Sequence, residues 1–117
     1  YIVDQLNALN LVYIHVIEGA TGGPRDIAPF DYASLRKRFK GAYMANNGYD
    51  LALANEVLDA GAADLIAFGK PFISNPDLVE RLKAGAPLNE FDKTTFYGGG
   101  AKGYIDYPTL KQSQAAE

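Results

Sequence analysis

The sequence contains no cysteine and only one histidine. Without cysteine the chain has no disulfide bond, no thiol nucleophile and no thiolate metal site. Because zinc sites combine several histidine and cysteine ligands, a zinc site built on His15 alone is not expected. The net charge of -3 provides no basic excess that would neutralise phosphates, so we do not expect a nucleic-acid partner.

Long apolar runs are absent as well. No run approaches the ~20 residues that a membrane-spanning helix requires, and no basic-then-apolar leader precedes the first helix pattern. We therefore expect a soluble, cytoplasmic protein of one domain at most, since 48% of the 117 residues are hydrophobic. The first helix pattern, "YIVDQLNALN", has no capping residue before it, so we expect the sequence to begin within a structure.

Apolar strand patterns alternate with helix patterns along the chain. "LVYIHVIE", "GAYMAN" and "DLIAF" are continuous apolar runs, as in strands covered on both faces. Helix patterns occupy residues 1–10, 32–39, 51–60 and 76–84. The expected N-caps are Asp31, Asp50 and Asn75, with Pro76 at a first helical position and with Gly61 and Gly85 as terminators.

The strands begin near residues 11, 41 and 64, which is the spacing of parallel strand–helix–strand crossovers. Three parallel strands cannot close a sheet, and a complete (β/α)8 barrel needs ~250 residues. The predicted fold is therefore α/β: the carboxyl-terminal part of a (β/α)8 TIM barrel, about strands 6 to 8 with their helices. Residues 1–110 would form this portion, and residues 111–117, "KQSQAAE", a flexible tail.

Two loops follow expected strands and combine glycine with polar residues. In parallel α/β folds, ligands bind at the carboxyl ends of the strands. Asn46-Asn47-Gly48 and Gly69-Lys70 lie there, where glycine lets a ligand approach the backbone and helix starts and a cation attract phosphate. The alternative is a pair of tight turns with a solvated lysine. The residues alone leave these interpretations about even, and the ligand they indicate is one that bears a phosphate.

Other polar residues have simpler interpretations. His15 is more typical of a hydrogen-bonded core residue than of a base. Glu18 is more typical of a carboxylate that anchors a loop than of a ligand-binding group. A basic cluster at a helix end is most simply a solvated helix terminus; it comprises Arg36, Lys37, Arg38 and Lys40.

Phe96 and Tyr97 precede three glycines, Gly98 to Gly100. This turn could carry two aromatic rings over a pocket, or it could belong to a strap that packs aromatics against the barrel wall. Periodicity does not separate the two interpretations, and the residues alone favour the strap.

Four segments together resemble the carboxyl-terminal region of the Old Yellow Enzyme family, and its bacterial branch of xenobiotic, N-ethylmaleimide and pentaerythritol tetranitrate reductases most closely. They are "YIHVIEG", "YMANNGYD", "AFGKPFISNPDLVERL" and "APLNEFDKTTFYGGGAKGYIDYPTL", in the family's order and spacing. The resemblance covers nearly the whole chain and implies a (β/α)8 barrel with non-covalent FMN. It also implies hydride transfer from NADPH or NADH through the flavin to activated alkenes (enones, maleimides), nitrate esters or nitro compounds.

The resemblance assigns roles to residues. It implies that Asn46-Asn47-Gly48 contacts the FMN phosphate and that Gly69-Lys70 holds the same phosphate, with lysine where arginine is more familiar. It implies that Phe96 lies near the flavin ring and Tyr97 near the substrate, which reverses the preference for a strap. The loop 19–24 would border the substrate channel. The family's oxygen-binding pair and proton-donating tyrosine match no residue here, so no catalytic residue is expected in this chain.

Two functions from different classes follow. The first is a portion of an FMN-dependent ene-reductase, which acts on a small molecule once the barrel is complete. The alternative is an isolated half-barrel, a structural or assembly fragment without turnover of its own. It would associate with the remaining barrel segment, in the same or a separate chain, or with itself, to cover its open edges. A third and weaker possibility is another barrel enzyme with a phosphate-bearing ligand.

Overall fold

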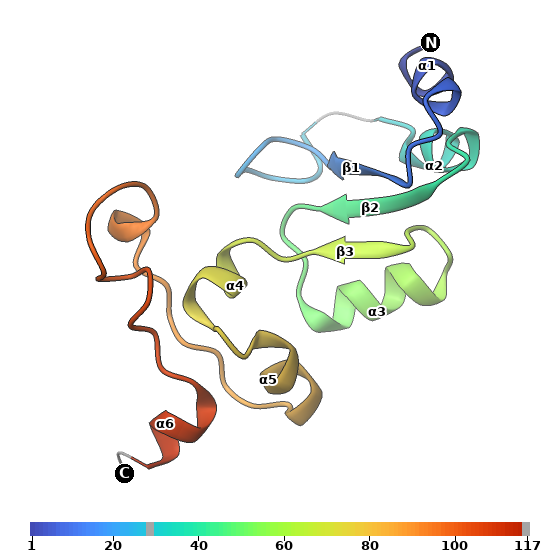
Figure 1. Cartoon of the computed structure of the whole chain (residues 1–117). Helices are drawn as coiled ribbons and strands as arrows, with labels where there is room; N and C mark the ends of the chain where they lie inside the picture. Colours follow the sequence, from blue (N-terminus) through green and yellow to red (C-terminus); the bar gives the residue numbers. More distant parts are fainter. Residues whose placement is uncertain (28–29, 116–117) are drawn as a thin grey trace. The chain divides into compact units, whose positions relative to one another are not determined.

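A computed structural model describes residues 1–27 and 30–115 (Figure 1). The chain divides into two compact units, Tyr1–Ala67 and Phe68–Glu117. Each unit has its own internal packing.

The first unit contains a three-stranded parallel sheet in the order β1-β2-β3, as predicted (Figure 1). Its strands are β1 (Tyr13–Ile17), β2 (Ala42–Asn46) and β3 (Leu65–Ala67). Ile17 pairs with Asn46, and Asn46 pairs with Ala67. The carboxyl ends of all three strands therefore meet at one edge of the sheet, as the site prediction requires.

Three helices accompany this sheet: α1 (Ile2–Ala8), α2 (Tyr32–Arg38) and α3 (Leu51–Asp59). The Asp31 carboxylate accepts a hydrogen bond from the Ser34 N–H at 2.8 Å, and the Asp50 carboxylate accepts one from Leu53 at 2.8 Å. Both predicted N-caps are thus confirmed, because each carboxylate satisfies an N–H that has no partner within its helix.

The sheet has one buried face and one open face. Tyr43 and Ala45 of β2 are buried at 1% and 0% exposure, and Ile14 and Val16 of β1 pair with them on the same face. The opposite face carries Tyr13, Ile17 and Leu65, which are 51%, 42% and 43% exposed. The apolar strands are therefore partly uncovered in this chain, as expected for three parallel strands that do not close a barrel. Strands are covered on both faces only where side chains lie on each side of the sheet, and the described residues supply them on one side.

The second unit contains α4 (Lys70–Ser74), α5 (Leu78–Ala84), a 3-10 turn η1 (Lys93–Thr95) and α6 (Leu110–Gln114). Here the predicted cap at Asn75 with Pro76 in the first turn is wrong, because α5 begins after Asp77. The Asn75 side chain is fully buried: it donates to the Pro71 carbonyl at 2.8 Å and accepts from the Asn89 N–H at 2.8 Å. These bonds occupy the groups that a cap would use. Gly85 ends α5 with φ 62°, as predicted.

Arg81 is the largest buried side chain of the second unit, with only 2% of its surface exposed. Its guanidinium pairs with Asp77 at 2.8 Å and donates to the carbonyls of Pro87 at 2.6 Å and Pro108 at 3.0 Å. A buried charge requires such partners. Arg81 therefore joins α5 to the segment after it and to the chain that leads into α6.

The predicted tail, residues 111–117, begins inside α6. The Thr109 side chain and Gln112 form a capping box at the start of this helix. Residues 116 and 117 lie outside the described part, and helical structure does not measure mobility, so the flexible tail stays a prediction. Within residues 1–27 and 30–115, no helix is long and apolar enough to cross a membrane. The same ranges contain no cluster of metal-binding side chains.

Candidate functional site

Glu18 follows β1 at the carboxyl edge of the sheet and is 8% exposed. Its carboxylate accepts hydrogen bonds from Arg25 at 2.7 Å, from the Tyr49 hydroxyl at 2.7 Å and from the Tyr43 hydroxyl at 3.1 Å. Arg25 belongs to the glycine-rich loop after β1, and its guanidinium also lies 4.2 Å from the centre of the Tyr49 ring. The prediction that Glu18 anchors a loop is confirmed.

The two tyrosines of this cluster are held neutral. Burial, followed by the charge of Glu18, raises the pKa of Tyr43 well above its ordinary value. Burial and the hydrogen bond to Glu18 raise the pKa of Tyr49 to about 12. Ionising either hydroxyl would place a second negative charge beside a buried carboxylate. Both hydroxyls therefore act as hydrogen-bond donors at neutral pH.

The predicted loop Asn46-Asn47-Gly48 lies at the same edge, but Asn46 is not a loop residue, because it is the last residue of β2. Its Oδ1 accepts a hydrogen bond from the Asn47 N–H at 2.6 Å. The Asn46 side chain contacts His15 Nε2 at 3.0 Å, and His15 itself is exposed. His15 is therefore hydrogen-bonded, as predicted, but it does not lie in the core, because it is on the open face of the sheet.

Asn47 has φ 108°, which is unusual for a residue with a side chain. Its Nδ2 lies 2.6 Å from the carbonyl oxygen of Glu18, 3.1 Å from that of Ala20 and 3.2 Å from that of Gly23, so its two hydrogens are shared among three acceptors. Next to it, Gly48 has φ 66°, and an added Cβ would meet only the Arg25 side chain at 3.7 Å. The main chain at Gly48 therefore has room for a ligand, whereas the Asn47 carboxamide is occupied.

Gly69 and Lys70 follow β3 in the sequence and belong to the second unit. The predicted turn is the start of α4: Gly69 precedes the helix without a side-chain cap, and Lys70 is its first residue. An added Cβ at Gly69 would meet nothing within 4 Å. Lys70 is exposed and has no carboxylate at ion-pair distance among the described residues. An open glycine beside a free cation suits a phosphate group chemically.

Phe96 and Tyr97 lie in the second unit, after η1. The ring of Phe96 packs on Phe91 with centroids 5.5 Å apart, whereas Tyr97 is 94% exposed. Gly98 and Gly99 have φ 84° and 98°, so the backbone turns there as glycine permits. Phe96 thus has a packing role in this unit, and no described residue covers Tyr97.

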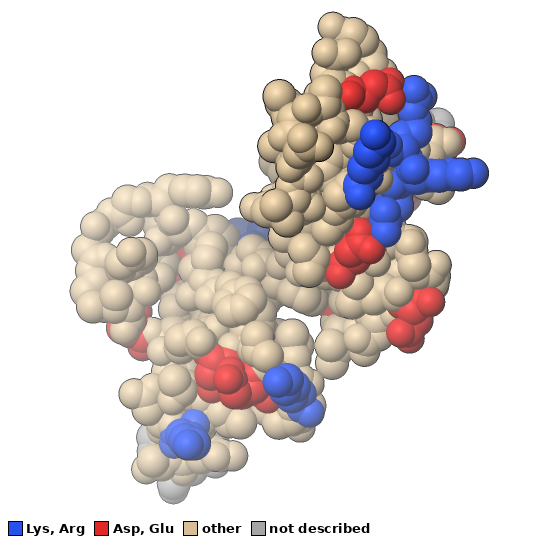
Figure 2. Space-filling model, turned by 45° about the vertical axis from the view of Figure 1, so that its right-hand side comes forward, with Lys and Arg blue, Asp and Glu red and all other residues tan. Residues whose placement is uncertain are grey.

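The basic cluster at the end of α2 lies at the surface, where Figure 2 shows lysine and arginine side chains gathered. Two of its members are paired: Arg36 with Asp64 at 2.6 Å and Arg38 with Asp4 at 2.9 Å. The cluster is thus partly neutralised, which fits a helix end better than a binding surface.

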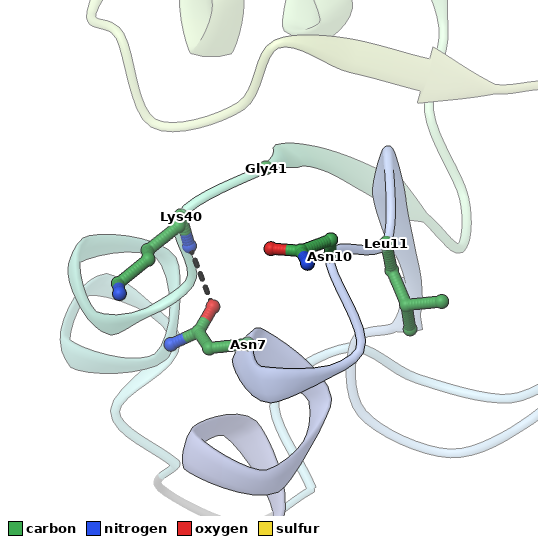
Figure 3. A pocket seen from close by; sticks show the side chains of 5 residues that line it. All are labelled: Asn7, Asn10, Leu11, Lys40 and Gly41. Carbon is green, nitrogen blue, oxygen red and sulfur yellow. Dashed lines mark hydrogen bonds between the residues drawn. The ribbon is translucent and has the colours of Figure 1, made fainter.

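Two hollows lie away from the predicted residues. One, of about 200 Å³, is lined by Asn7, Asn10, Lys40 and their neighbours, where the Lys40 N–H donates to Asn7 at 2.9 Å (Figure 3). It lies before β1 and β2, at the opposite edge of the sheet from Glu18. The other, in the second unit, is lined by residues between Pro71 and Phe91. Neither brings a titratable cluster together.

Sequence reasoning missed Arg25 and Tyr49, which complete the Glu18 cluster. Arg25 is the one cation of the loop "GATGGPRD", and a buried carboxylate at the end of the preceding strand requires such a partner. That signal would have identified Arg25. No sequence signal would have identified Tyr49, because its contact with Glu18 spans 31 residues.

Comparison with known proteins places these observations in a family. Residues 1–89 match the sequence profile described as the NADH:flavin oxidoreductase / NADH oxidase family. A putative 12-oxophytodienoate reductase 3 of Oryza sativa subsp. japonica is 42% identical over 97% of this chain, and a 12-oxophytodienoate reductase-like protein of Solanum lycopersicum is 38% identical over 95%.

Solved structures agree. Morphinone reductase is 44% identical, with a TM-score of 0.85 over 97% of this chain. The old yellow enzyme homologue of Zymomonas mobilis is 40% identical, with a TM-score of 0.85 over 92%. The chain spans about 30% of the length of these relatives, 31% of the rice protein and 30% of morphinone reductase. The chain therefore belongs to the Old Yellow Enzyme family of NADH:flavin oxidoreductases and spans about 30% of the length of these relatives.

Proposed function

We propose that this chain is part of an FMN-dependent ene-reductase and corresponds to about strands 6 to 8 of its barrel. The observation that carries the proposal is the family match over residues 1–89, together with open glycines after β2 and β3. Barrels commonly bind phosphate through the loops after strands 7 and 8 and the start of a short extra helix. Helix α4, which the sequence did not predict, supports this assignment because it is such a helix.

In this proposal each residue has a limited role. The main chain at Gly48 and the pair Gly69-Lys70 would contribute to binding the FMN phosphate, with Lys70 supplying the positive charge. The Asn47 N–H already donates to Asn46 Oδ1 at 2.6 Å. Asn46, the last residue of β2, would orient the loop through this hydrogen bond. Because Asp50 already caps α3 with a carboxylate, the start of α3 is unsuited to an anion. We therefore assign the phosphate to the loop before Asp50.

The aromatic pair is assigned to the other end of the cofactor. Phe96 would line the flavin side of the pocket, and Tyr97 would face the substrate, which its exposure permits. Bound FMN would supply the redox chemistry, accepting hydride from NADPH or NADH and passing it to an activated alkene or a nitro compound. Residues of this chain would bind and position the flavin, whereas the proton donor would come from the rest of the barrel.

The test compares FMN with riboflavin, which lacks the phosphate, by flavin fluorescence titration of the complete protein. Lys70→Ala should weaken FMN binding by roughly tenfold or more, the worth of a charge-assisted hydrogen bond, and leave riboflavin binding unchanged. The flavin-loaded fraction should transfer hydride at close to the parent rate. Lys83→Ala, an exposed lysine on α5, is the matched control. Equal FMN occupancy in Lys70→Ala and parent would refute the assignment.

A second candidate function is an assembly fragment that has no turnover of its own. The open face of the sheet favours it: Tyr13, Ile17 and Leu65 are about half exposed, and β1 and β3 are edge strands. Such a chain would associate with the remaining barrel segment or with a second copy to cover this face. Flavin binding distinguishes the two candidate functions, because the assembly fragment alone would not bind flavin.

A further inference from the structure

Two loops meet at the carboxyl edge of the sheet in the first unit. The 18–25 loop follows β1, and the segment 46–49, here the 46–49 loop, begins at the last residue of β2. In parallel barrels these are the loops that form the ligand-binding face. The contacts between them are polar and involve both side chains and main chain.

The first connection is the Asn47 carboxamide. Its Nδ2 lies 2.6 Å from the Glu18 carbonyl, 3.1 Å from that of Ala20 and 3.2 Å from that of Gly23. All three acceptors belong to the main chain of the 18–25 loop, and one side chain thus spans almost the whole turn. The loop also bonds to itself, through the Ala20 N–H to Pro24 and the Gly23 N–H to Ala20.

The backbone at Asn47 would be easier for glycine. At φ 108° a side chain is strained, so asparagine at this position has a cost that the carboxamide must offset. Asparagine tolerates positive φ better than most residues, but tolerance does not account for three carbonyl acceptors in the neighbouring loop.

A second connection joins the same two loops. Glu18 accepts a hydrogen bond from Arg25 in its own loop and from Tyr49 in the other, both at 2.7 Å. Arg25 also donates to the Tyr49 hydroxyl at 3.0 Å. The 46–49 loop is therefore joined to the 18–25 loop at Asn47 and again at Tyr49.

We propose that Asn47 is a positioning residue whose carboxamide fastens the 18–25 loop to the 46–49 loop. The two loops then become ordered together when a ligand binds to either of them. Because coupling between two sites is reciprocal, ordering the 46–49 loop also lowers the cost of ordering the 18–25 loop.

The first test is hydrogen exchange of the complete, FMN-free protein. Asn47→Gly removes the carboxamide and relieves the backbone strain. It should raise exchange in peptides covering residues 19–25 by about fivefold or more, the factor for losing one hydrogen bond of ordinary net strength. Asn10→Gly is the matched control: Asn10 also has positive φ, 52°, but no side-chain bond among the described residues. It should leave these peptides unchanged.

Asn47→Asp is the second variant, because it keeps the shape of the side chain and cannot donate to the carbonyls. It should raise exchange in the 19–25 peptides as Asn47→Gly does. Unchanged or slower exchange in these peptides in either variant would overturn the proposal. So would a rise of equal size in every peptide of the protein, because the loss would then not be specific to the loop.

The second test adds FMN as the probe and rests on the proposed function. In the parent protein FMN should slow exchange both in peptides covering 46–50 and in those covering 19–25. In Asn47→Gly it should slow only the former. Equal slowing of the 19–25 peptides in parent and variant would overturn the coupling. If FMN slowed neither set in the parent, the proposed phosphate site would be wrong, and the exchange rates without FMN would still decide the role of Asn47.

Discussion

At the scale of single residues, the first unit is organised around one buried carboxylate. Glu18 is 8% exposed and has three side-chain donors, namely Arg25, Tyr43 and Tyr49. A buried charge is tolerated only when it is paired and hydrogen-bonded. The cluster is therefore complete as it stands, and this explains why a lone glutamate at the end of an apolar strand is not solvated.

The Glu18 cluster predicts that the free energy of unfolding decreases at alkaline pH. An unfolded tyrosine ionises near 10, whereas in the fold burial and Glu18 raise the pKa of Tyr49 to about 12. The unfolded chain therefore loses its proton first, and stability should fall as pH rises from about 10 to about 12. Tyr49→Phe cannot ionise, so its loss of stability across this window should be smaller than that of the parent.

Urea unfolding at pH 9 and pH 11 measures this difference. At pH 9 the variant should be less stable than the parent by about 1 kcal/mol, the net worth of the lost hydrogen bonds. Tyr97→Phe, whose ring is almost fully exposed, should keep the parent's response to pH. A Tyr49→Phe variant with the parent's response would contradict the prediction.

At the scale of elements, the second unit is held together by side chains that donate hydrogen bonds to the main chain of other segments. Arg81 on α5 binds the carbonyls of Pro87 and Pro108, and Asn89 donates to the carbonyls of Ser74 and Pro108. Gly103 lies where an added Cβ would overlap Thr95, so the loop after η1 closes tightly. These side-chain contacts hold the segments of the second unit together, as hydrogen bonds between strands do in the first unit.

Arg81→Met should therefore destabilise the protein. The substitution keeps an apolar stem but leaves the Pro87 carbonyl without its donor and removes the Arg81 contacts to Pro108 and Asp77. An unsatisfied buried acceptor costs about 1–3 kcal/mol. Lys83→Met, an exposed position on the same helix, is the control and should change stability little. The urea midpoints of the two variants are compared. Equal midpoints would show that the Arg81 contacts do not stabilise the protein.

At the scale of the whole molecule, the chain exposes an apolar sheet face. Tyr13, Ile17 and Leu65 lie on it with between 42% and 51% of their surface exposed. Apolar patches of this kind mark surfaces that another segment covers. This chain spans only about 30% of the length of morphinone reductase, and under the proposed function the rest of the barrel would cover this face.

The 117-residue chain by itself should therefore associate. Sedimentation velocity should show a sedimentation coefficient that rises with concentration, because burying apolar surface favours assembly. Ile17→Lys should reduce the association by charging the open face. Leu58→Lys, at an exposed apolar position on α3, should not. A steady monomer at all concentrations would contradict the prediction and would also count against the assembly function.

Local signals in the sequence predicted much of this structure. Asp31, Asp50 and Gly85 mark helix ends through bonds to residues within a few positions, and strand spacing predicts the parallel order. The same reasoning located the candidate site at the carboxyl edge and assigned Glu18 to a loop. It failed at Asn75, whose side chain bonds to Asn89 and not to the first turn of a helix.

Sequence patterns alone were enough to predict the caps of α2 and α3, the end of α5, the parallel strands and the family of the protein. The open face of the sheet and the buried polar side chains became known only from the packing of the folded chain. Asn47 bonds to Glu18 across 29 residues, and Arg81 bonds to Pro108 across 27. Helix caps and turns are formed within a few residues, so a local pattern encodes them. Contacts between distant residues depend on how the elements pack, and no local pattern encodes that.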